Sequence, residues 1–555
     1  MSIGQVDDDL VICGPTPAEP LLEIKTAGKE IFEKLLTYNT AKDAIIDAFT
    51  EEKLSYGALL QKICDLAEAL RFHGYTTGTV VSICSENNIN FFIPVLASLF
   101  IGCIMAPVNH NYVQNELIHL FNISKPKVVF CSKNVSLKIL DLKATLSYIS
   151  RIIIIDSDES APGTETLDEF VTSSLRGRHI SPYHFQPLEG DPAKLGAFIF
   201  CSSGTTGFPK GVLLSQKNMY VRLLQSRDPR YYVKTTGENK SILGLLPFFH
   251  AFGMCIGLEA ITRGDKLIVL KRFDEDMFLK CIQDYKISEL LLAPPIAVFL
   301  EKSSKVLQYD LSSVKEIVCG AAPLSRETEQ AIRKKLKNIQ TIRQGYGLTE
   351  ATLAITLLAQ GEQRPGSCGR VITFMSCKVR DPETGKALGP NTVGELCFKG
   401  PMVMAGYYND EKATKETFTP DGWLRTGDLG YYDKEKYFYI VDRMKELIKY
   451  KGFQVAPAEL EALLLNHPKV RDVGVVGLPD DIAGELPVAF VVKKEGHEDV
   501  TEAELQNYVA SMVSSPKHLR GGVIFVSEIP KNPSGKILRR VLKDRLKGYR
   551  PTKKI

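Results

Sequence analysis

Short runs of apolar residues, many of them β-branched, recur along roughly the first 370 residues and alternate with helical patterns. These runs, each bounded by turn residues, lie at 79–83, 128–130, 152–155, 197–200, 267–270, 290–292 and 316–318. Uninterrupted apolar strands that alternate with helices are typical of parallel sheets covered on both faces. This part of the chain is therefore predicted to be α/β.

Beyond about residue 370 the strands become shorter and their apolar and polar positions alternate, with turns at Asp381-Pro382, Gly389-Pro390 and Asn409-Asp410. Alternation of this kind is typical of antiparallel strands with one solvated face. We therefore expect an antiparallel, barrel-like lobe. From about Arg443 helix and strand patterns mix again, and no internal repeat is present.

The stretch 91–108 is uncharged, and its length is near the lower limit for crossing a bilayer. Pro94, Gly102 and Pro107 interrupt it. A buried helix that ends near Gly102, followed by a short strand, explains the pattern better than a transmembrane segment does.

Composition adds limits on the class of protein. A chain of 555 residues is too long for one core, and 44% hydrophobic with 24% charged residues is a globular composition. The net charge is +4, but residues 536–555 carry nine Lys/Arg against Asp544 alone. We interpret this basic end as a solvated final helix rather than a polyanion site, and we expect no nucleic-acid binding.

The twelve cysteines form no C-x-x-C pair and no metal-ligand spacing, so we expect free thiols in a reducing compartment. The N-terminus carries Asp7, Asp8 and Asp9 and lacks the basic start and apolar centre of a signal peptide.

The run Cys201-Ser202-Ser203-Gly204-Thr205-Thr206-Gly207-Phe208-Pro209-Lys210-Gly211 follows a predicted strand. Small residues let backbone N–H groups turn toward an anion, hydroxyls add donors, and a lysine adds charge. It is not a Walker A motif, because Pro209 precedes the lysine and Gly211 follows it. The candidate phosphate contacts are Ser202, Ser203, Gly204, Thr205, Thr206, Gly207 and Lys210.

At this loop the chain resembles the adenylate-forming acyl-CoA synthetase superfamily, in particular its beetle luciferases, fatty acyl-CoA synthetases and 4-coumarate:CoA ligases. The resemblance runs from about Leu54-Ser55-Tyr56 to Lys536. Further motifs in the family's order and spacing are Gln344-Gly345-Tyr346-Gly347-Leu348-Thr349-Glu350, Gly394-Glu395-Leu396, Gly422-Trp423-Leu424-Arg425-Thr426-Gly427-Asp428, Val441-Asp442-Arg443, Lys449-Tyr450-Lys451-Gly452 and Pro533-Ser534-Gly535-Lys536.

The resemblance implies an α/β fold with a large N-terminal adenylation domain, residues 1–442, in which two mixed or parallel sheets are sandwiched with helices beside a barrel-like lobe. A small, mobile α+β domain, residues 443–555, is expected to follow. The implied chemistry has two half-reactions: a carboxylate attacks the α-phosphorus of ATP, and the thiol of CoA then attacks the acyl carbon. ATP, Mg²⁺ and CoA are therefore expected, and no prosthetic group.

The resemblance also implies roles for single residues. Glu350 is the expected Mg²⁺ ligand, and Thr349 is expected to donate to the α-phosphate. Asp428 and Arg443 are expected to bind the ribose. The candidate adenine contacts are Gly320, Ala321, Ala322 and Tyr346, whose ring can stack. Gln344, Gly345 and Gly347 are further candidate ATP/AMP-binding residues.

Two lysines are expected to work in turn. Lys536 would bridge the substrate carboxylate and phosphate during adenylation, and Lys451 would serve thioester formation. Both lie next to glycine, which permits close approach of a ligand. Asp442 matches the family's hinge residue.

The acyl pocket is expected to include His250, Phe252 and Arg227. Ile256 and Leu353 stand where beetle luciferases commonly carry Thr and Ser, so the pocket should be more apolar. We therefore favour a medium- or long-chain fatty acid as substrate. A beetle-type luciferase and then a 4-coumarate:CoA ligase are the alternatives. A non-catalytic protein is not favoured, because Lys536 and Glu350 are present.

The chain ends Lys553-Lys554-Ile555, which preserves only part of the Ser-Lys-Leu address that a peroxisomal import receptor reads. We expect either the peroxisome or the cytosol.

Overall fold

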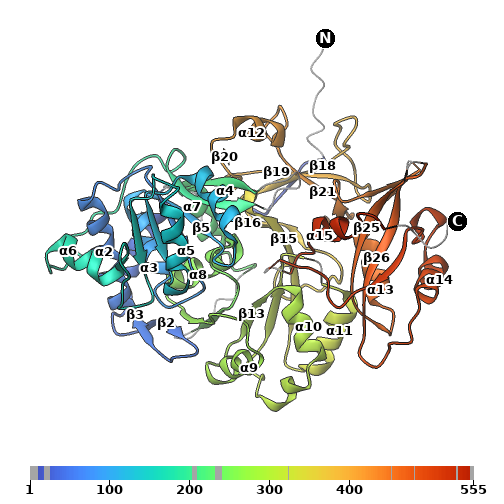
Figure 1. Cartoon of the computed structure of the whole chain (residues 1–555), viewed down its shortest axis with the longest axis horizontal. Helices are drawn as coiled ribbons and strands as arrows, with labels where there is room; N and C mark the ends of the chain where they lie inside the picture. Colours follow the sequence, from blue (N-terminus) through green and yellow to red (C-terminus); the bar gives the residue numbers. More distant parts are fainter. Residues whose placement is uncertain are drawn as a thin grey trace, which may run out of the picture.

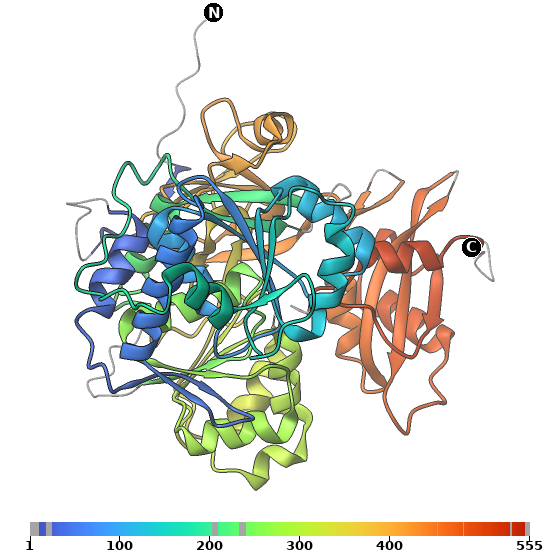
Figure 2. The same cartoon turned by 60° about the vertical axis from the view of Figure 1, so that its left-hand side comes forward.

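The computed structural model describes residues 10–17, 25–202, 209–231, 240–322, 324–451, 453–480, 482–532 and 535–549. Within these ranges a large N-terminal domain contains four sheets, and a smaller C-terminal domain contains one (Figure 1). Figure 2 shows the C-terminal domain as a separate lobe beside the N-terminal domain. The predicted α/β fold with a large and a small domain is confirmed.

The largest sheet has the order β20-β10-β9-β5-β4-β6-β7-β8. Its strands are β4 (Val80–Cys84), β5 (Ile104–Val108), β6 (Val128–Cys131), β7 (Arg151–Ile154), β8 (Glu165–Thr166), β9 (Gly196–Ser202), β10 (Lys210–Ser215) and β20 (Gly406–Tyr407). From β9 to β8 the pairs are parallel, as predicted from the apolar runs. The surrounding helices are α2 (Tyr56–Phe72), α3 (Phe92–Ile101), α4 (Gln114–Ser124), α5 (Lys133–Lys143), α6 (Leu167–Leu175) and α7 (Gln216–Gln225).

The uncharged stretch forms the buried helix α3, which ends at Gly102 in the left-handed conformation, and then strand β5. This confirms the prediction of a buried helix and a strand. Among the described residues, no helix has the length and hydropathy of a membrane span.

Two further sheets complete the α/β part. One has the order β11-β12-β2-β3 and the other β13-β14-β15-β16-β17. Their strands are β2 (Asp43–Asp47), β3 (Lys53–Ser55), β11 (Ser241–Gly244), β12 (Lys266–Val269), β13 (Glu289–Leu292), β14 (Glu316–Cys319), β15 (Thr341–Leu348), β16 (Leu353–Leu357) and β17 (Arg370–Val371). The associated helices are α1 (Ala27–Leu35), α8 (Ala251–Arg263), α9 (Glu275–Asp284), α10 (Pro294–Lys302) and α11 (Arg326–Lys335).

The predicted antiparallel lobe has the order β1-β18-β19-β21-β22, and each of these neighbouring strands pairs antiparallel with the next. Its elements are β1 (Ile12–Cys13), β18 (Ser376–Arg380), β19 (Gly394–Lys399), β21 (Leu424–Tyr432), β22 (Phe438–Arg443) and the neighbouring α12 (Glu411–Thr417). The lobe is confirmed, with one addition: strand β1 comes from the N-terminus, and a two-residue strand gives no periodic signal.

The C-terminal domain contains β23 (Ile448–Tyr450), β24 (Phe453–Val455), α13 (Pro457–Leu465), β25 (Val470–Asp480), β26 (Gly484–Lys493), α14 (Glu502–Met512), β27 (Gly522–Phe525) and α15 (Arg539–Arg545). The basic end of the chain supplies α15, which buries Leu542 and exposes most of its charges, as expected for a solvated final helix. The predicted domain boundary after Asp442 falls one residue before the end of β22. All twelve cysteines are free thiols, as predicted.

Candidate active site

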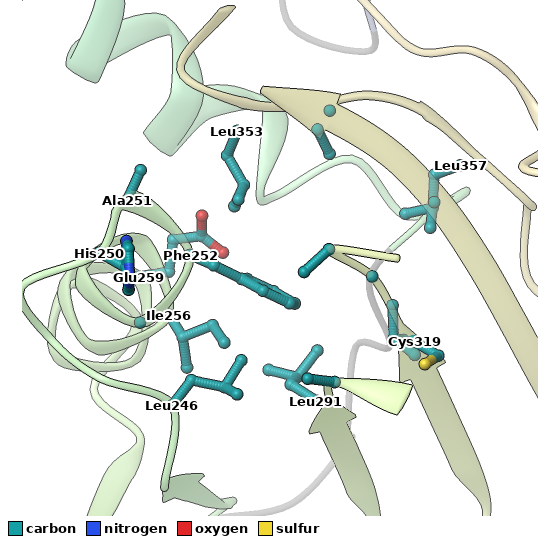
Figure 3. A pocket seen from close by; sticks show the side chains of 18 of the residues that line it. Leu246, His250, Ala251, Phe252, Ile256, Glu259, Leu291, Cys319, Leu353 and Leu357 are labelled. Atoms are coloured by element: carbon teal, nitrogen blue, oxygen red, sulfur yellow. The ribbon is translucent and has the colours of Figure 1, made fainter. Parts of the chain in front are cut away.

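A cavity of about 200 Å³ lies between helix α8 and strands β13, β14 and β15. Figure 3 shows Phe252 and Ile256 on the helix facing Leu291 and Cys319 on the strands. Parallel strands present alternate residues to one face. Leu291 and Ala293 line the cavity in accordance with this alternation, whereas consecutive residues line it at 318–321 and 345–349.

Asp428 is the centre of the nucleotide part of the site. It lies directly opposite Arg443 in the register of β21 and β22, and Arg443 Nε is 3.0 Å from Asp428 Oδ1. The hydroxyl of Tyr346 donates to Asp428 Oδ2 at 2.6 Å. Burial raises the pKa of Asp428, and the Arg443 guanidinium and the Tyr346 hydroxyl oppose this shift. The structure thus brings together the predicted ribose pair and the predicted adenine ring contact.

The backbone conformation shapes the part of the cavity wall that is predicted to contact adenine. Gly320 and Ala321 line the cavity, and Ala321 has φ of +72°. A Cβ on Gly347 would lie 1.8 Å from the carbonyl oxygen of Leu353, so only glycine fits where β15 meets β16. Gly345 lines the same wall, whereas Ala322 follows the turn outside it.

Gln344 has a different position from the one expected. Its side chain accepts from the Leu324 N–H at 3.0 Å and donates to the Leu324 carbonyl at 3.2 Å. It therefore fixes the loop that carries Gly320, Ala321 and Ala322 rather than lining the cavity.

At the phosphate end, β9 and β10 pair Ser202 with Lys210. The predicted contacts Ser203, Gly204, Thr205, Thr206 and Gly207 lie outside the described residues.

Tyr407 joins two of the predicted phosphate-side residues. Lys210 Nζ lies 4.9 Å from the centre of the Tyr407 ring, and the Tyr407 hydroxyl donates to Glu350 Oε1 at 3.1 Å. Sequence reasoning missed Tyr407, although its place in a Gly-Tyr-Tyr turn was a possible signal.

Glu350 and Thr349 belong to the short helix η3 (Thr349–Ala351) that follows β15. A single carboxylate with an adjacent hydroxyl fits Mg²⁺, which keeps waters and shares phosphate oxygens of the nucleotide. Glu350 would hold the ion, and Thr349, which lines the cavity, remains available to the α-phosphate.

Lys536 from the C-terminal domain is directed to this site. Burial lowers the pKa of Lys536 to about 8, and Arg443 adds to this effect while Glu446 and Asp428 oppose it. The backbone N–H of Lys536 donates to Asn532 Oδ1 at 2.8 Å. The preceding Gly535 has φ of +82°, and a Cβ there would lie 2.7 Å from Pro295 Cγ of α10. The two domains therefore contact each other closely at Gly535.

Lys451 lies elsewhere. It is exposed in the turn between β23 and β24, its N–H donates to the Ala483 carbonyl at 2.7 Å, and its Nζ is 5.7 Å from the Tyr450 ring. Asp442, the predicted hinge, accepts from the N–H groups of Arg443 at 2.7 Å and of Ala458 at 3.0 Å. Asp442 thus connects β22 with the first turn of α13.

Of the predicted acyl-pocket residues, His250, Phe252, Ile256 and Leu353 line the cavity. His250 precedes α8, and burial lowers its pKa to about 4, so the imidazole is neutral at pH 7. Leu353 has φ of +99°, an unusual conformation for a bulky residue. Arg227 is not among the lining residues and pairs instead with Glu30 at 2.6 Å.

The far end of the cavity differs from the expected apolar pocket. It is lined by charged side chains that sequence reasoning did not select, namely Arg222, Glu259, Arg263, Glu289 and Arg343. They come from four distant segments, so no local motif could reveal them.

The fold and the site define an adenylate-forming enzyme, and the chain belongs to this family. The family model described as AMP-binding enzyme matches residues 32–408, and the model of the AMP-binding enzyme C-terminal domain matches residues 459–536. The chain is 44% identical to luciferin 4-monooxygenase of Photuris pensylvanica over 98% of this chain and 99% of that protein. It is 39% identical to a probable 4-coumarate–CoA ligase of Dictyostelium discoideum over 90% and 92% of the two chains.

Solved structures agree. ATP-bound MatB from Rhodopseudomonas palustris superimposes with a TM-score of 0.82 at 26% identity, over 94% of this chain and 99% of that one. A red-emitting luciferase from Phrixothrix hirtus gives a TM-score of 0.73 at 43% identity, over 98% and 100%.

Proposed function

We propose that this protein is an AMP-forming acyl-CoA synthetase that activates a medium- or long-chain fatty acid and transfers the acyl group to CoA. The observation that supports the proposal most strongly is the position of Lys536 beside Asp428, whose partner Tyr346 lines a cavity with apolar walls. Ile256 and Leu353 contribute to those walls, and each methylene buried there adds about 0.8 kcal/mol.

In the first half-reaction the fatty carboxylate attacks the α-phosphorus, and pyrophosphate leaves. Asp428 accepts hydrogen bonds from the ribose hydroxyls while Arg443 and Tyr346 hold the carboxylate in place. The ammonium of Lys536 neutralises charge that develops between the carboxylate and the phosphate. Mg²⁺, when bound, supplies further positive charge on the phosphate oxygens.

In the second half-reaction the CoA sulfur attacks the acyl carbon, and AMP leaves. The Lys536 loop must then withdraw and the C-terminal domain must present its Lys451 face. His250, at the start of α8 on the cavity wall, stays neutral.

Light production from luciferin is the second candidate function. It is favoured by the 44% identity to a luciferin 4-monooxygenase. The walls formed by Ile256 and Leu353 argue against it, since neither offers a hydroxyl to a heteroaromatic acid.

A substrate screen tests both functions. AMP release and ATP–pyrophosphate exchange are measured with octanoate, dodecanoate, 4-coumarate and luciferin, with and without CoA, and light is recorded with luciferin. We expect CoA-dependent AMP release with the fatty acids at least about tenfold above that with coumarate, from differential burial of methylenes. Preferred adenylation of coumarate, or strong light with luciferin and no fatty acyl-CoA, contradicts the proposal.

The variant Leu353→Ser tests the wall itself. It removes apolar surface and adds a hydroxyl, so the ratio of fatty-acid to luciferin adenylation is expected to fall about tenfold. An unchanged ratio in the same exchange assay would show that Leu353 does not set the preference.

A further inference from the structure

One face of helix α8 changes character along the cavity. Four residues of α8 lie on a single helical face, because they are spaced by four, three and four residues. They are Phe252, Ile256, Glu259 and Arg263. All four line the cavity. Phe252 lies at the nucleotide end, where a Cβ on Gly320 would be 3.4 Å from its ring. The face is therefore apolar near the adenylate and ionic at the opposite end.

Strands β13, β14 and β15, which face α8, likewise carry charged residues at the end of the cavity opposite the adenylate. Glu289 begins β13, Glu316 begins β14, and Arg343 lies near the start of β15. Register pairs Glu289 with Glu316 and Val318 with Arg343. The amino ends of the strands are thus charged, whereas their carboxyl ends carry Gly320 and Gly345 at the nucleotide.

The charged side chains at this end form two linked groups. Arg222 Nε and Nη2 both lie 2.7 Å from Glu259 Oε1, and Arg263 Nη1 lies 3.7 Å from Glu259 Oε2. Arg263 Nε also pairs with Asp265 at 2.9 Å.

In the second group, Lys240 Nζ lies 2.7 Å from Glu289 and Arg343 Nη2 lies 3.5 Å from Glu289. Arg343 Nε is 2.6 Å from Glu316 Oε1. Four cations therefore face four carboxylates, and the side chains of Arg222, Glu259, Glu289 and Arg343 are each no more than 5% exposed.

The equal number of positive and negative groups determines which ligand groups can bind at the ionic end of the cavity. A further anion would face Glu259 and Glu289 in a buried space, and a further cation would face three guanidinium groups, so either charge would be penalised. A neutral hydroxyl can both donate to a carboxylate and accept from a guanidinium. Among the described residues, Glu316 Oε2 is buried without a hydrogen-bond partner, and Arg343 Nε, although 2.6 Å from Glu316 Oε1, is not aligned as a hydrogen-bond donor to it. Of these two residues Arg343 lines the cavity, so the ionic end retains polar capacity there.

An acid with a purely apolar distal end would gain less binding free energy at the ionic end of the cavity. A terminal methyl group cannot hydrogen-bond, and it would displace any water from charged groups without replacing its contacts. From Phe252 to Glu259 the helix rises about 10 Å. Carbon–carbon bonds of about 1.5 Å in a zigzag cover this distance with about eight methylenes.

We infer that the cavity selects an acid of about this length that carries a neutral hydrogen-bonding group, namely a hydroxyl, at the end opposite its carboxylate. This inference rests on the proposed acyl-CoA synthetase function and names the substrate class of the same site. The hydroxyl donates to a carboxylate of the ionic end, and its oxygen accepts from Arg343 or Arg222.

The test compares four acids of one length that differ only at the distal end: octanoate, 8-hydroxyoctanoate, octanedioate and 8-aminooctanoate. We expect kcat/KM for adenylation of 8-hydroxyoctanoate to exceed that of octanoate about tenfold, as for one hydrogen bond to a charged group. Both charged acids should fall below octanoate. If octanoate equals or exceeds 8-hydroxyoctanoate, the inference is overturned while the proposed function stands. If no acid yields acyl-CoA, the proposed function itself fails.

A double variant tests the location. Arg222→Met with Glu259→Leu replaces a buried ion pair by apolar groups of similar size, an exchange that folded proteins often tolerate. The preference for the hydroxyl should fall at least fivefold, about the value of the weakened hydrogen bond. The matched control is Lys378→Met with Asp421→Leu, which removes a 2.7 Å pair of the antiparallel lobe and should leave the ratio unchanged.

Glu259→Gln serves if the double variant does not fold, as judged by thermal melting. The amide keeps the shape of the side chain but loses its charge, so the ratio of kcat/KM for 8-hydroxyoctanoate to that for octanoate should fall. A wild-type preference that persists in Glu259→Gln and in the double variant would place hydroxyl recognition elsewhere and overturn the assignment.

Discussion

The surroundings of the Lys536 ammonium group disfavour an isolated positive charge. Burial and the neighbouring Arg443 guanidinium lower its pKa to about 8, below the ordinary value of 10.5. An anionic carboxylate and a phosphate in the site would oppose both effects and raise the pKa of Lys536, because opposite charges favour the ammonium form. The free enzyme therefore presents a lysine whose charge depends on pH in a measurable range.

This property predicts a pH dependence of adenylation. Above pH 8 the free enzyme loses the Lys536 proton, so kcat/KM for ATP in the exchange reaction should fall with an apparent pKa of about 8. Lys536→Arg keeps its charge at all these pH values and should remove that limb, whatever its absolute rate. A wild-type profile that stays level to pH 10 would contradict the burial of Lys536 described above.

Asp428 yields a second prediction at this scale. Asp428→Asn removes the negative charge that Arg443 and Tyr346 contact. It also removes one hydrogen-bond acceptor for the ribose. Hydrogen bonds to charged groups contribute about 1.5–3 kcal/mol, so KM for ATP should rise about 10- to 100-fold. Asp421→Asn also removes a carboxylate of the antiparallel lobe, yet it lies outside the site and should leave KM unchanged. Equal effects of the two variants in the exchange assay would contradict the ribose role.

At the scale of elements, the contact between the Lys536 loop and α10 depends on one glycine. Gly535 has a positive φ, and Pro295 leaves no space for a Cβ. The contact thus requires both the conformation and the size of glycine.

Gly535→Ala should therefore impair docking of the loop and slow adenylation at least about tenfold, a cost of about 1.4 kcal/mol, while thioester formation from a supplied acyl-adenylate is kept. Gly548→Ala is the matched control, because Gly548 has nearly the same φ, +85°, and nothing lies within 4 Å of an added Cβ. If both variants slow adenylation alike, backbone strain and not the Pro295 contact is responsible.

The elements also show how far sequence reasoning reaches. The buried strands β4, β6, β7 and β14 follow from apolar runs, because a parallel strand covered on both faces has few other sequence patterns. Strand β1 has two residues and depends on its partner β18, so no local pattern indicates it.

The candidate site likewise contains some residues that the sequence predicts and others that it does not. Asp428, Tyr346 and Arg443 lie in recognisable motifs, and the structure brings them together. Gln344 shares a motif with Tyr346, but the backbone N–H and carbonyl of Leu324 hold its side-chain amide, a contact between distant residues that the motif does not reveal. The ionic end of the cavity could not be predicted, since Glu259 and Arg343 meet only after α8 packs beside the sheet.

At the scale of the whole molecule, the two lysines cannot act from one arrangement. Lys536 is half-buried and near enough to Asp428 for that carboxylate to affect its pKa, whereas Lys451 is exposed in the β23–β24 turn of the same small domain. The observed arrangement fits adenylation. The proposed thioester formation would require a rotation of the C-terminal domain, and Asp442 lies where β22 leads into that domain.

The most direct test of this alternation is to measure the two half-reactions separately in Lys536→Ala and Lys451→Ala. Rapid mixing with ATP and octanoate reports adenylation, and supplied octanoyl-adenylate with CoA reports thioester formation. The account predicts that Lys536→Ala slows adenylation about 100-fold or more, with thioester formation changed less than about twofold, and that Lys451→Ala shows the reverse. If both variants slow both half-reactions equally, one static site serves both steps, and the account of two domain arrangements is contradicted.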